Sequence, residues 1–352
     1  MINNNRTVEN TWNMLQYLYD ELRNKRFRNF DITGIKTIDD LYAAVIARWC
    51  TSIAKEGLYK EYVEVENEEL TSPKGQINIQ MSMALQTRSR GTLICSYDEL
   101  SENIYINHVL KGALQYLLYD SEIDKEVKNS VQKAMQLFNG VEYVDINFIH
   151  WKDIKFNNNN IRYKNLIEVC KNVVTERKLE KASELDDNKR LYLLFKKQII
   201  KWYKVKYGET DDVELFEQPY TMIENEPYFE TRMHPSQRLI AIKNERQALL
   251  ICVRLQDEKL LDDATLGRKQ ANEMVKYLRE YMKTYKIKVS GCLVYVNTDD
   301  KKLNLNPITI NVIDDFVVGE TTVDIHDQWR FISNKLEDTY KYFIQRGKNR
   351  KK

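Results

Sequence analysis

The side chains that most often bind transition metals or act as nucleophiles are not spaced for either task in this chain. The five cysteines lie far apart and form no Cys-x-x-Cys pair, and the four histidines lack the spacing of metal ligands. These residues are Cys50, Cys95, Cys170, Cys252 and Cys292, and His108, His150, His234 and His326. The pattern therefore suggests neither disulfides nor a zinc site.

Chemistry on phosphates is limited by two further features. The chain has no Gly-x-x-x-x-Gly-Lys-[Ser/Thr] loop to cradle nucleotide phosphates, which excludes a P-loop GTPase. Its 54 Lys and Arg residues are balanced by 52 Asp and Glu residues, which argues against a protein that coats nucleic acid by charge alone. A local basic groove is not excluded. The basic tail, residues 346–352, could meet DNA phosphates or be a solvated end.

Apolar periodicity and turn residues predict an N-terminal half in which strands are enclosed between helices. Leu41, Val45 and Trp49, at steps of four, mark the second helix. Helices are expected at 8–24, 39–56, 103–119, 123–138 and 162–178, with strands within 58–97, where Ile77 and Ile79 alternate with polar residues. Ser101, just before an apolar run, is expected to be a helix N-cap.

The segment 180–189 is charged and has no apolar period, so we expect the main domain boundary there. Beyond it the pattern predicts an α-β-β-β-α-β order, followed by one more strand and a last helix. The expected helices are 187–206, 265–285 and 324–345, and the expected strands are 213–219, 237–243, 248–255, 289–296 and 308–313. No signal peptide and no run of eighteen apolar residues is apparent, which predicts a soluble, cytoplasmic protein.

Several short blocks in the first 111 residues stand out. They are Val8-Glu9-Asn10-x-x-x-Met14-Leu15-x-Tyr17, Ser72-Pro73-Lys74-Gly75-Gln76-Ile77, Cys95-Ser96-Tyr97-Asp98-Glu99-Leu100-Ser101-Glu102-Asn103 and Asn107-x-x-Leu110-Lys111. Read physically, the later blocks form a turn, a short strand and a capped helix. Their order and spacing resemble the N-terminal half of the McrC family, the nuclease subunit of two-gene, modification-dependent restriction systems.

The resemblance implies an α+β multi-domain fold. Residues 1–180 are then a mixed α/β region with a helical segment that binds a partner. Residues 181–352 are then a restriction-endonuclease-like PD-(D/E)xK core that ends in the basic tail. The α-β-β-β-α-β order fits such a core independently of any motif.

At the positions where the resemblance implies catalytic acids and a lysine, the chain carries other residues. Ser236, or a close neighbour, stands at the first acid, Cys252 at the second, and Arg254 replaces the lysine. Lys196 stands at a further acid position. Mg²⁺ prefers carboxylate oxygens, and an arginine cannot accept a proton as a general base. We therefore expect an inactive nuclease centre with no cofactor. Read by itself, Cys252 is a small buried hydrophobic residue.

The alternative is an active Mg²⁺-dependent endonuclease whose acids have moved. Acids flank the two strands that carry the altered motif, namely Glu224, Glu226, Glu230, Glu245, Asp257 and Glu258. A metal site requires two or more of them to converge. Acids in turns are otherwise simply solvated.

Residues 156–164, Phe-Asn-Asn-Asn-Asn-Ile-Arg-Tyr-Lys, are polar and turn-prone. On their own, four asparagines are typical of a solvent-exposed connector. The resemblance implies another interpretation, since the N-terminal half of McrC-like proteins enters the pore of a hexameric AAA+ GTPase and a polar, basic loop near this position touches its nucleotide machinery. On that interpretation Asn158, Asn159, Arg162 and Lys164 contact the GTPase.

The resemblance thus predicts a McrC-like subunit of a McrBC-type restriction and anti-phage defence complex. Such a subunit binds and regulates a McrB-like AAA+ GTPase hexamer, meets DNA through the complex and has no contact with a membrane. A third hypothesis is a structural interaction protein that has kept the fold but neither DNA nor the GTPase.

Overall fold

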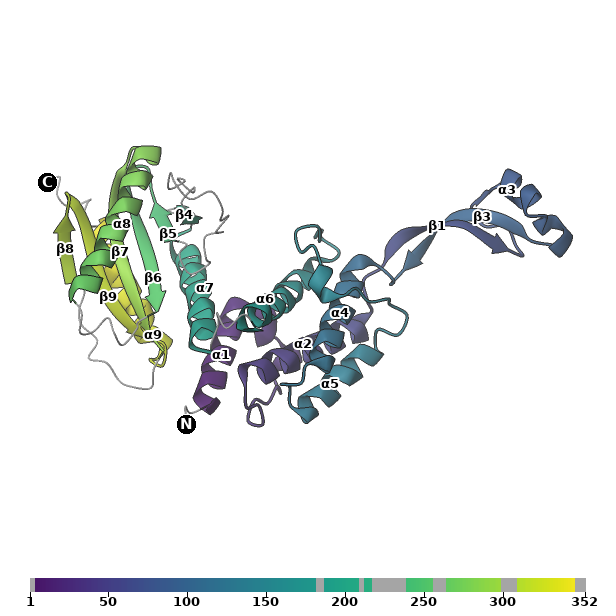
Figure 1. Cartoon of the computed structure of the whole chain (residues 1–352), viewed down its shortest axis with the longest axis horizontal. Coiled ribbons are helices and arrows are strands. Elements are labelled where there is room, and N and C mark those ends of the chain that lie inside the picture. The colour runs from purple at the N-terminus through teal and green to yellow at the C-terminus, as the bar shows by residue number, and fades with distance from the viewer. Residues whose placement is uncertain are drawn as a thin grey trace. The chain divides into compact units, whose positions relative to one another are not determined.

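The computed structural model describes residues 4–181, 187–208, 212–216, 239–255, 264–298 and 309–345. The chain forms two compact units (Figure 1). One is Arg23–Glu184, and the other joins Met1–Leu22 to Leu185–Lys352. The division lies close to the boundary expected at 180, but it assigns the first 22 residues to the C-terminal unit. The described residues include no helix with the length and apolar character of a membrane span.

The unit Arg23–Glu184 has a helical body and an arm. The body is built from α2 (Ile38–Glu56), α4 (Tyr105–Tyr119), α5 (Lys125–Gln136) and α6 (Lys164–Lys181). At the start of α2 the Thr37 hydroxyl accepts a hydrogen bond from the Asp40 amide at 3.0 Å, as an N-cap does. Leu41, Val45 and Trp49 are all buried, which confirms the helix predicted from their spacing.

The arm is the segment 61–101 between α2 and α4 (Figure 1). Its strands β1 (Glu61–Leu70) and β3 (Leu93–Ser101) pair antiparallel, and β2 (Gln76–Ile77) pairs with the other edge of β3. No residue of β1 is buried, so this strand is exposed to water on both faces. At its far end α3 (Ile79–Ala84) and the tight turn Thr87–Arg90 cover a small core that includes Ile94 and Cys95.

Two local predictions in this unit were wrong. Ile79, expected in a strand, begins α3, because the Asn78 side chain caps the Met81 amide at 3.0 Å. Ser101 is not the N-cap of α4. It ends β3 and accepts a hydrogen bond from the Asn103 amide at 3.0 Å, while Ile104 precedes the helix.

The C-terminal unit is a mixed six-stranded sheet in the order β4-β5-β6-β7-β9-β8 (Figure 1). Strands β6, β7 and β9 are parallel, and the other neighbours are antiparallel. The strands are β4 (Asp212–Phe216), β5 (Leu239–Lys243), β6 (Gln247–Leu255), β7 (Lys288–Asn297), β8 (Thr309–Ile313) and β9 (Phe316–Asp324). The helices are α1 (Asn4–Leu18), α7 (Asp187–Tyr207), α8 (Ala264–Tyr285) and α9 (Trp329–Tyr340).

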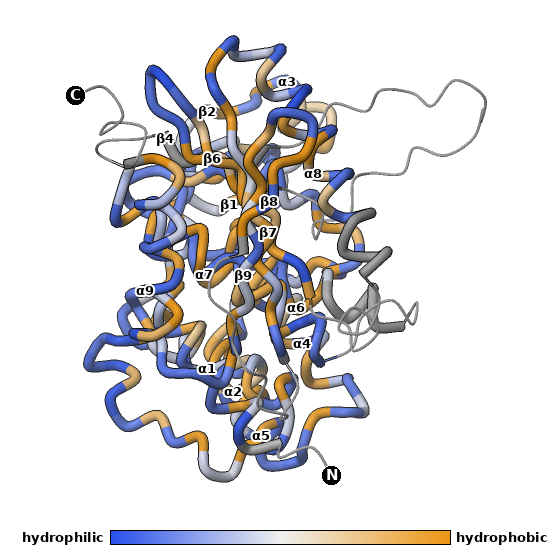
Figure 2. Tube along the Cα trace, turned by 90° about the vertical axis from the view of Figure 1, so that its left-hand side faces the viewer, coloured by the Kyte–Doolittle hydropathy of each residue, from blue (hydrophilic) through white to orange (hydrophobic). Residues whose placement is uncertain are grey.

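One part of the core of this unit lies between α8 and one face of the sheet, and the residues on the opposite face of β6, such as Leu249 and Ile251, are buried too. Leu250 and Cys252 of β6 and Leu293 of β7 pack against Met274 and Leu278 of α8. The hydropathy of the central strand follows this burial, with hydrophobic residues along β7 (Figure 2). The predicted α-β-β-β-α-β order is observed as α7-β4-β5-β6-α8-β7.

Strand β9 was not predicted, and the last helix begins at Trp329 rather than at 324. The central residues of β9, Gly-Glu-Thr-Thr, are a poor apolar pattern. The strand is fixed instead by pairing on both sides, with β7 and with β8.

The first sequence block belongs to α1 and packs on this C-terminal unit. Val8, Met14 and Leu15 are buried. The ring of Tyr17 lies 5.4 Å from that of Trp329, and Asn10 Nδ2 lies 2.8 Å from His326 Nδ1. The block is therefore a packing element of the sheet unit.

Candidate functional site

Cys252 and Arg254, which the sequence resemblance sets at two positions of a nuclease motif, lie on β6, and Cys252 packs against α8. Cys252 and Arg254 are two residues apart and therefore share one face of the strand. Arg254 Nε lies 3.3 Å from Cys252 Sγ, and Arg254 Nη2 donates to Glu273 Oε2 of α8 at 2.7 Å. Tyr277 donates its hydroxyl to the other oxygen of the same carboxylate at 3.1 Å. The arginine is therefore fixed by protein groups on two sides.

Burial decides the chemistry of the cysteine. Cys252 is 3% exposed, which confirms its reading as a buried residue. Burial raises the pKa of the Cys252 thiol, although Arg254 and Lys196 act in the opposite direction. For Arg254, burial works to lower the pKa, but Cys252 and Glu273 raise it overall. At neutral pH the site thus holds a neutral thiol and a fixed cation, which is unsuited to binding Mg²⁺.

The structure brings together three of the four sequence-predicted positions. Lys196 of α7 is only 4% exposed, and its charge acts on Cys252. One turn earlier, the Tyr192 hydroxyl donates to the Val253 carbonyl of β6. The fourth position, Ser236, lies outside the described residues.

Sequence reasoning missed the acids that face this centre. Glu273 reaches it from α8, and Glu320 of β9 shares a register row with Cys252 and Leu293. Burial raises the pKa of the Glu320 carboxyl. No spacing in the sequence indicated either residue, because their approach depends on where α8 and β9 pack.

The part of the chain that the structure describes contains no metal site that supports the alternative of an active endonuclease with relocated acids. Within those residues, no group of three or more His, Cys, Asp or Glu side chains could hold a metal ion. Glu245 is exposed in the turn between β5 and β6. The other candidates, Glu224, Glu226, Glu230, Asp257 and Glu258, lie outside the described residues.

The second block builds the outer part of the arm. Gly75 has φ +65° and lies against β3, where a Cβ would collide with the backbone oxygen of Ser96. Beside it, Lys74 Nζ lies 3.6 Å from the centre of the Tyr97 ring and 3.9 Å from Glu99. The Ser-Pro-Lys-Gly turn is therefore a folded contact on β3, and only glycine fits its last position.

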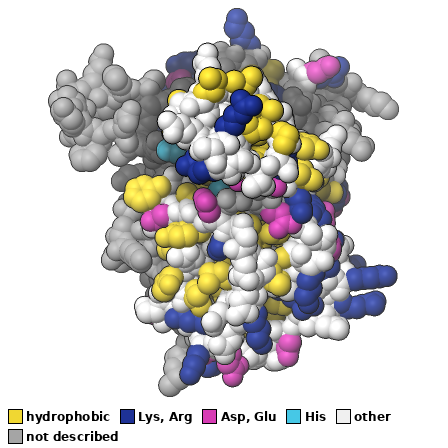
Figure 3. All heavy atoms as spheres, turned by 90° about the vertical axis from the view of Figure 1, so that its right-hand side faces the viewer, with side chains coloured by type: hydrophobic (Ala, Val, Ile, Leu, Met, Phe, Trp, Pro, Cys, Tyr) yellow, Lys and Arg dark blue, Asp and Glu magenta, His cyan; other side chains and the backbone are white. Residues whose placement is uncertain are grey.

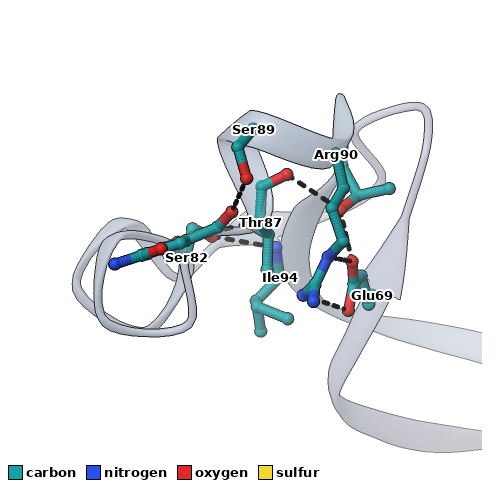
Figure 4. Close-up of polar contacts among 8 residues, drawn as sticks. Glu69, Ser82, Thr87, Ser89, Arg90 and Ile94 are labelled. Atoms are coloured by element: carbon teal, nitrogen blue, oxygen red, sulfur yellow. Dashed lines mark hydrogen bonds and ion pairs between the residues drawn. The ribbon is translucent and has the colours of Figure 1, made fainter.

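A polar network closes the tip of the arm, which we define as residues 76–95 (Figure 4). Arg90 donates from Nε and Nη2 to the two oxygens of Glu69, each at 3.0 Å. The Ser82 hydroxyl accepts from the Ile94 amide at 2.9 Å, and Thr87 donates to the Ser82 carbonyl at 3.3 Å. These contacts satisfy the buried polar groups of the tip and fix its shape.

The tip exposes large apolar side chains. Ile79 is 66% exposed, Met83 73% and Leu85 50%. Figure 3, viewed from the side of the arm, shows hydrophobic side chains next to Lys and Arg side chains. Contiguous apolar groups of this kind on a soluble surface are typical of a site for another macromolecule.

The asparagine run forms an ordered turn beside the root of the arm. Asn157 Oδ1 accepts from the amides of Asn159 and Asn160 at 2.9 and 3.1 Å, and Asn160 is buried. Arg162 Nη2 donates to the Gly57 carbonyl at 2.7 Å, and its Nη1 lies 3.4 Å from Glu56. Of the four residues expected to contact the GTPase, Asn158, Asn159 and Lys164 are exposed and Arg162 is partly buried.

Comparison with known proteins places these features in a family. The family model described as McrBC 5-methylcytosine restriction system component matches residues 2–202. No curated protein sequence matches the chain.

Two solved structures from Thermococcus gammatolerans are similar to the chain. One is a refined half-complex from a tetradecameric assembly of McrB AAA+ hexamers with bound McrC, at 14% identity and a TM-score of 0.52, covering 91% of this chain and 70% of that one. The other is the McrBC complex, at 19% identity, a TM-score of 0.36 and coverage of 45% and 48%, which is too low to carry an argument. At these identities the first match shows the fold alone. The family model, however, spans more than half of the chain, and the chain belongs to the McrBC 5-methylcytosine restriction system component family.

Proposed function

We propose that this chain is the McrC-like subunit of a McrBC-type restriction complex and that it binds a McrB-like AAA+ GTPase hexamer through the unit Arg23–Glu184. The observation that carries the proposal is the arm, whose strand β1 has no buried residue and whose tip exposes large apolar side chains. The solved assembly that resembles this fold contains McrB AAA+ hexamers with bound McrC. The same kind of partner is proposed for this chain.

The dimensions of the arm suit insertion into a ring. Ten residues of β1 span about 33 Å at roughly 3.3 Å per residue, and paired strands lie about 5 Å apart. The stem is narrow and rich in carboxylates, with Glu61, Glu64 and Glu66 on β1, although it also exposes Tyr62 and Leu100; the tip exposes Ile79, Met83 and Leu85. A narrow stem that ends in exposed apolar side chains is suited to reach a partner surface inside a ring, where a globular domain would not fit.

We propose that the C-terminal unit is a restriction-endonuclease-like core with an inactive metal centre. The order α7-β4-β5-β6-α8-β7 and the parallel pairing of β6 with β7 support the fold. The neutral Cys252 thiol and the Arg254–Glu273 contact support the loss of metal binding. On this proposal the unit meets DNA as part of the complex and does not cut it.

The partner is tested with a McrB-like AAA+ GTPase hexamer. A variant of the tip, Ile79→Ser with Met83→Ser and Leu85→Ser, should weaken binding of the hexamer at least tenfold, because these side chains would be buried in the complex. The matched control is Tyr119→Ser with Phe148→Ser, which removes two side chains of the same unit that are 78% and 76% exposed but lie outside the arm. Equal binding by both variants would show that the tip is not part of the interface.

A further inference from the structure

The strands of the arm do not by themselves set the direction in which the arm points. Because β1 is exposed along its length, no apolar face fastens the ladder to the helical body. The chain enters the arm through Gly57, which has φ +98°, and leaves it at Glu102 just before α4. The contacts at these two roots must therefore set where the arm points.

Asn107 in the first turn of α4 joins the two roots. Its Nδ2 donates to the Tyr59 carbonyl at 2.9 Å and to the Glu102 carbonyl at 2.8 Å. The residue is fully buried, and its Oδ1 has no partner among the described residues. Both neighbours are carbonyl oxygens, so the side chain acts through its two donors. A leucine has no donor, and a carboxylate would face both oxygens with negative charge.

Tyr163 holds the same root residue from the other side. Its hydroxyl accepts a hydrogen bond from the Tyr59 amide at 2.8 Å, and the two rings lie 6.4 Å apart. Tyr163 is fully buried. Side chains from two separate segments therefore occupy both backbone groups of Tyr59. Next to them, Arg162 binds the Gly57 carbonyl at 2.7 Å.

We propose that Asn107 and Tyr163 form a clamp that sets the direction of the arm, with Arg162 as its outer member. They are positioning residues, since they act on the partner only through the arm. The exposed pair Lys60–Glu102, at 3.1 Å, also crosses the roots but contributes little because water screens it. The clamp explains why Asn107 occurs in the fourth sequence block. Its effect on a GTPase rests on the proposed function, whereas its effect on the arm does not.

Hydrogen exchange on the full-length chain tests the clamp without any partner. In Asn107→Leu and in Tyr163→Phe, amides of residues 57–65 and 97–104 should exchange at least tenfold faster, while the tip and the core of α2 keep their protection. The matched control is Asn129→Leu, which alters an exposed asparagine on α5 and should change neither root.

Root exchange that is unchanged in Tyr163→Phe would overturn the clamp. Faster exchange in α2 to the same degree as at the roots would also overturn it, because the contacts would then serve the whole core. A second measurement uses the McrB-like GTPase. Both variants should retain binding within threefold but stimulate GTP turnover at least fivefold less, and equal stimulation by the loosened arm would contradict its positioning role. Failure of the unaltered chain to bind the GTPase would reject the proposed function and leave the exchange result standing.

Discussion

Arg254 Nη2 lies 2.7 Å from Glu273 Oε2, so the guanidinium at the position where the sequence resemblance implies a lysine is paired with a carboxylate of α8. A lysine at this position in an active centre must be able to approach a phosphate or a water molecule. Here the cation is held between Cys252 and Glu273. The pair thus fastens β6 to α8.

Removing the charge of Glu273 should weaken that fastening. Glu273→Gln is expected to lower the free energy of unfolding by about 1 kcal/mol, a value that allows for the partial exposure of the pair. The measurement is urea unfolding followed by circular dichroism. Glu280→Gln on the same helix breaks only the exposed pair with Lys283 and should change stability much less. An equal effect of the two substitutions would show that the Arg254 contact is no stronger than a surface ion pair.

The state of Cys252 gives a pH prediction. Because burial raises the pKa of its thiol above that of an exposed cysteine, the reactive thiolate should not form at neutral pH, and folding should be insensitive to this group there. Iodoacetamide at pH 7.5 should therefore leave Cys252 unmodified in the folded protein and label it after unfolding in urea. The extent of labelling is measured by mass spectrometry of the peptide that contains Cys252. Rapid labelling of the folded chain would indicate an activated thiol.

DNA cleavage should be absent. The purified chain with Mg²⁺ or Mn²⁺, with or without its GTPase partner and GTP, should cut neither methylated nor plain DNA, because a hydroxyl and a thiol cannot replace two carboxylate ligands and an arginine cannot accept a proton in place of the lysine. Cys252→Ala should leave the biological activity of the system nearly intact, since it disturbs only packing. Cleavage that disappears in Glu230→Gln or Glu245→Gln would instead establish the relocated site.

The outer turn of the arm provides a test with an internal control. Gly75→Ala should disorder the tip, because the new Cβ meets the β3 backbone at a φ of +65°. Gly91→Ala has a similar φ of +69° but open space around it, so it carries backbone strain without the collision. Limited trypsin digestion at Arg88 and Arg90 should be at least tenfold faster in the first variant than in the second. Equal rates would mean that the collision is relieved by a small shift.

The GTPase contact predicted for the asparagine turn is best tested at Lys164. Arg162 also belongs to the clamp, whereas Lys164 is exposed at the start of α6. If Lys164 reaches a nucleotide pocket, its cation stabilises phosphate charge, and Lys164→Ala should reduce partner GTP turnover without dissolving the complex. Asn158 and Asn159 can be replaced by Ala in the same assay. If GTP turnover is unchanged in all of these variants, the turn is a solvent-exposed connector and does not contact the GTPase.

The sequence predicted the elements that have a long apolar period and missed those fixed by packing. The helices α2 and α7 and the strand β6 lie within a residue or two of their predicted bounds. In α2, for example, Leu41 and Trp49 recur at a helical spacing, and both are buried, as is Leu250 in the apolar run of β6. Strand β9 was missed, since its Gly-Glu-Thr-Thr centre acquires strand structure from two neighbours. The role of Asn107 was equally hidden, because Tyr59 and Glu102 meet only when the arm folds back on itself.

In the proposed complex, the tip of the arm lies against a McrB-like hexamer. Photocrosslinking tests this directly, with a photoreactive amino acid placed at Met83 in the full-length chain and, as a control, at Phe148, which is equally exposed but lies outside the arm. In the presence of the GTPase and a non-hydrolysable GTP analogue, we predict crosslinks from position 83 to residues that line the pore of the partner, and few or none from position 148. Crosslinks from position 148 alone, or none from position 83 in a complex that has formed, would contradict the claim.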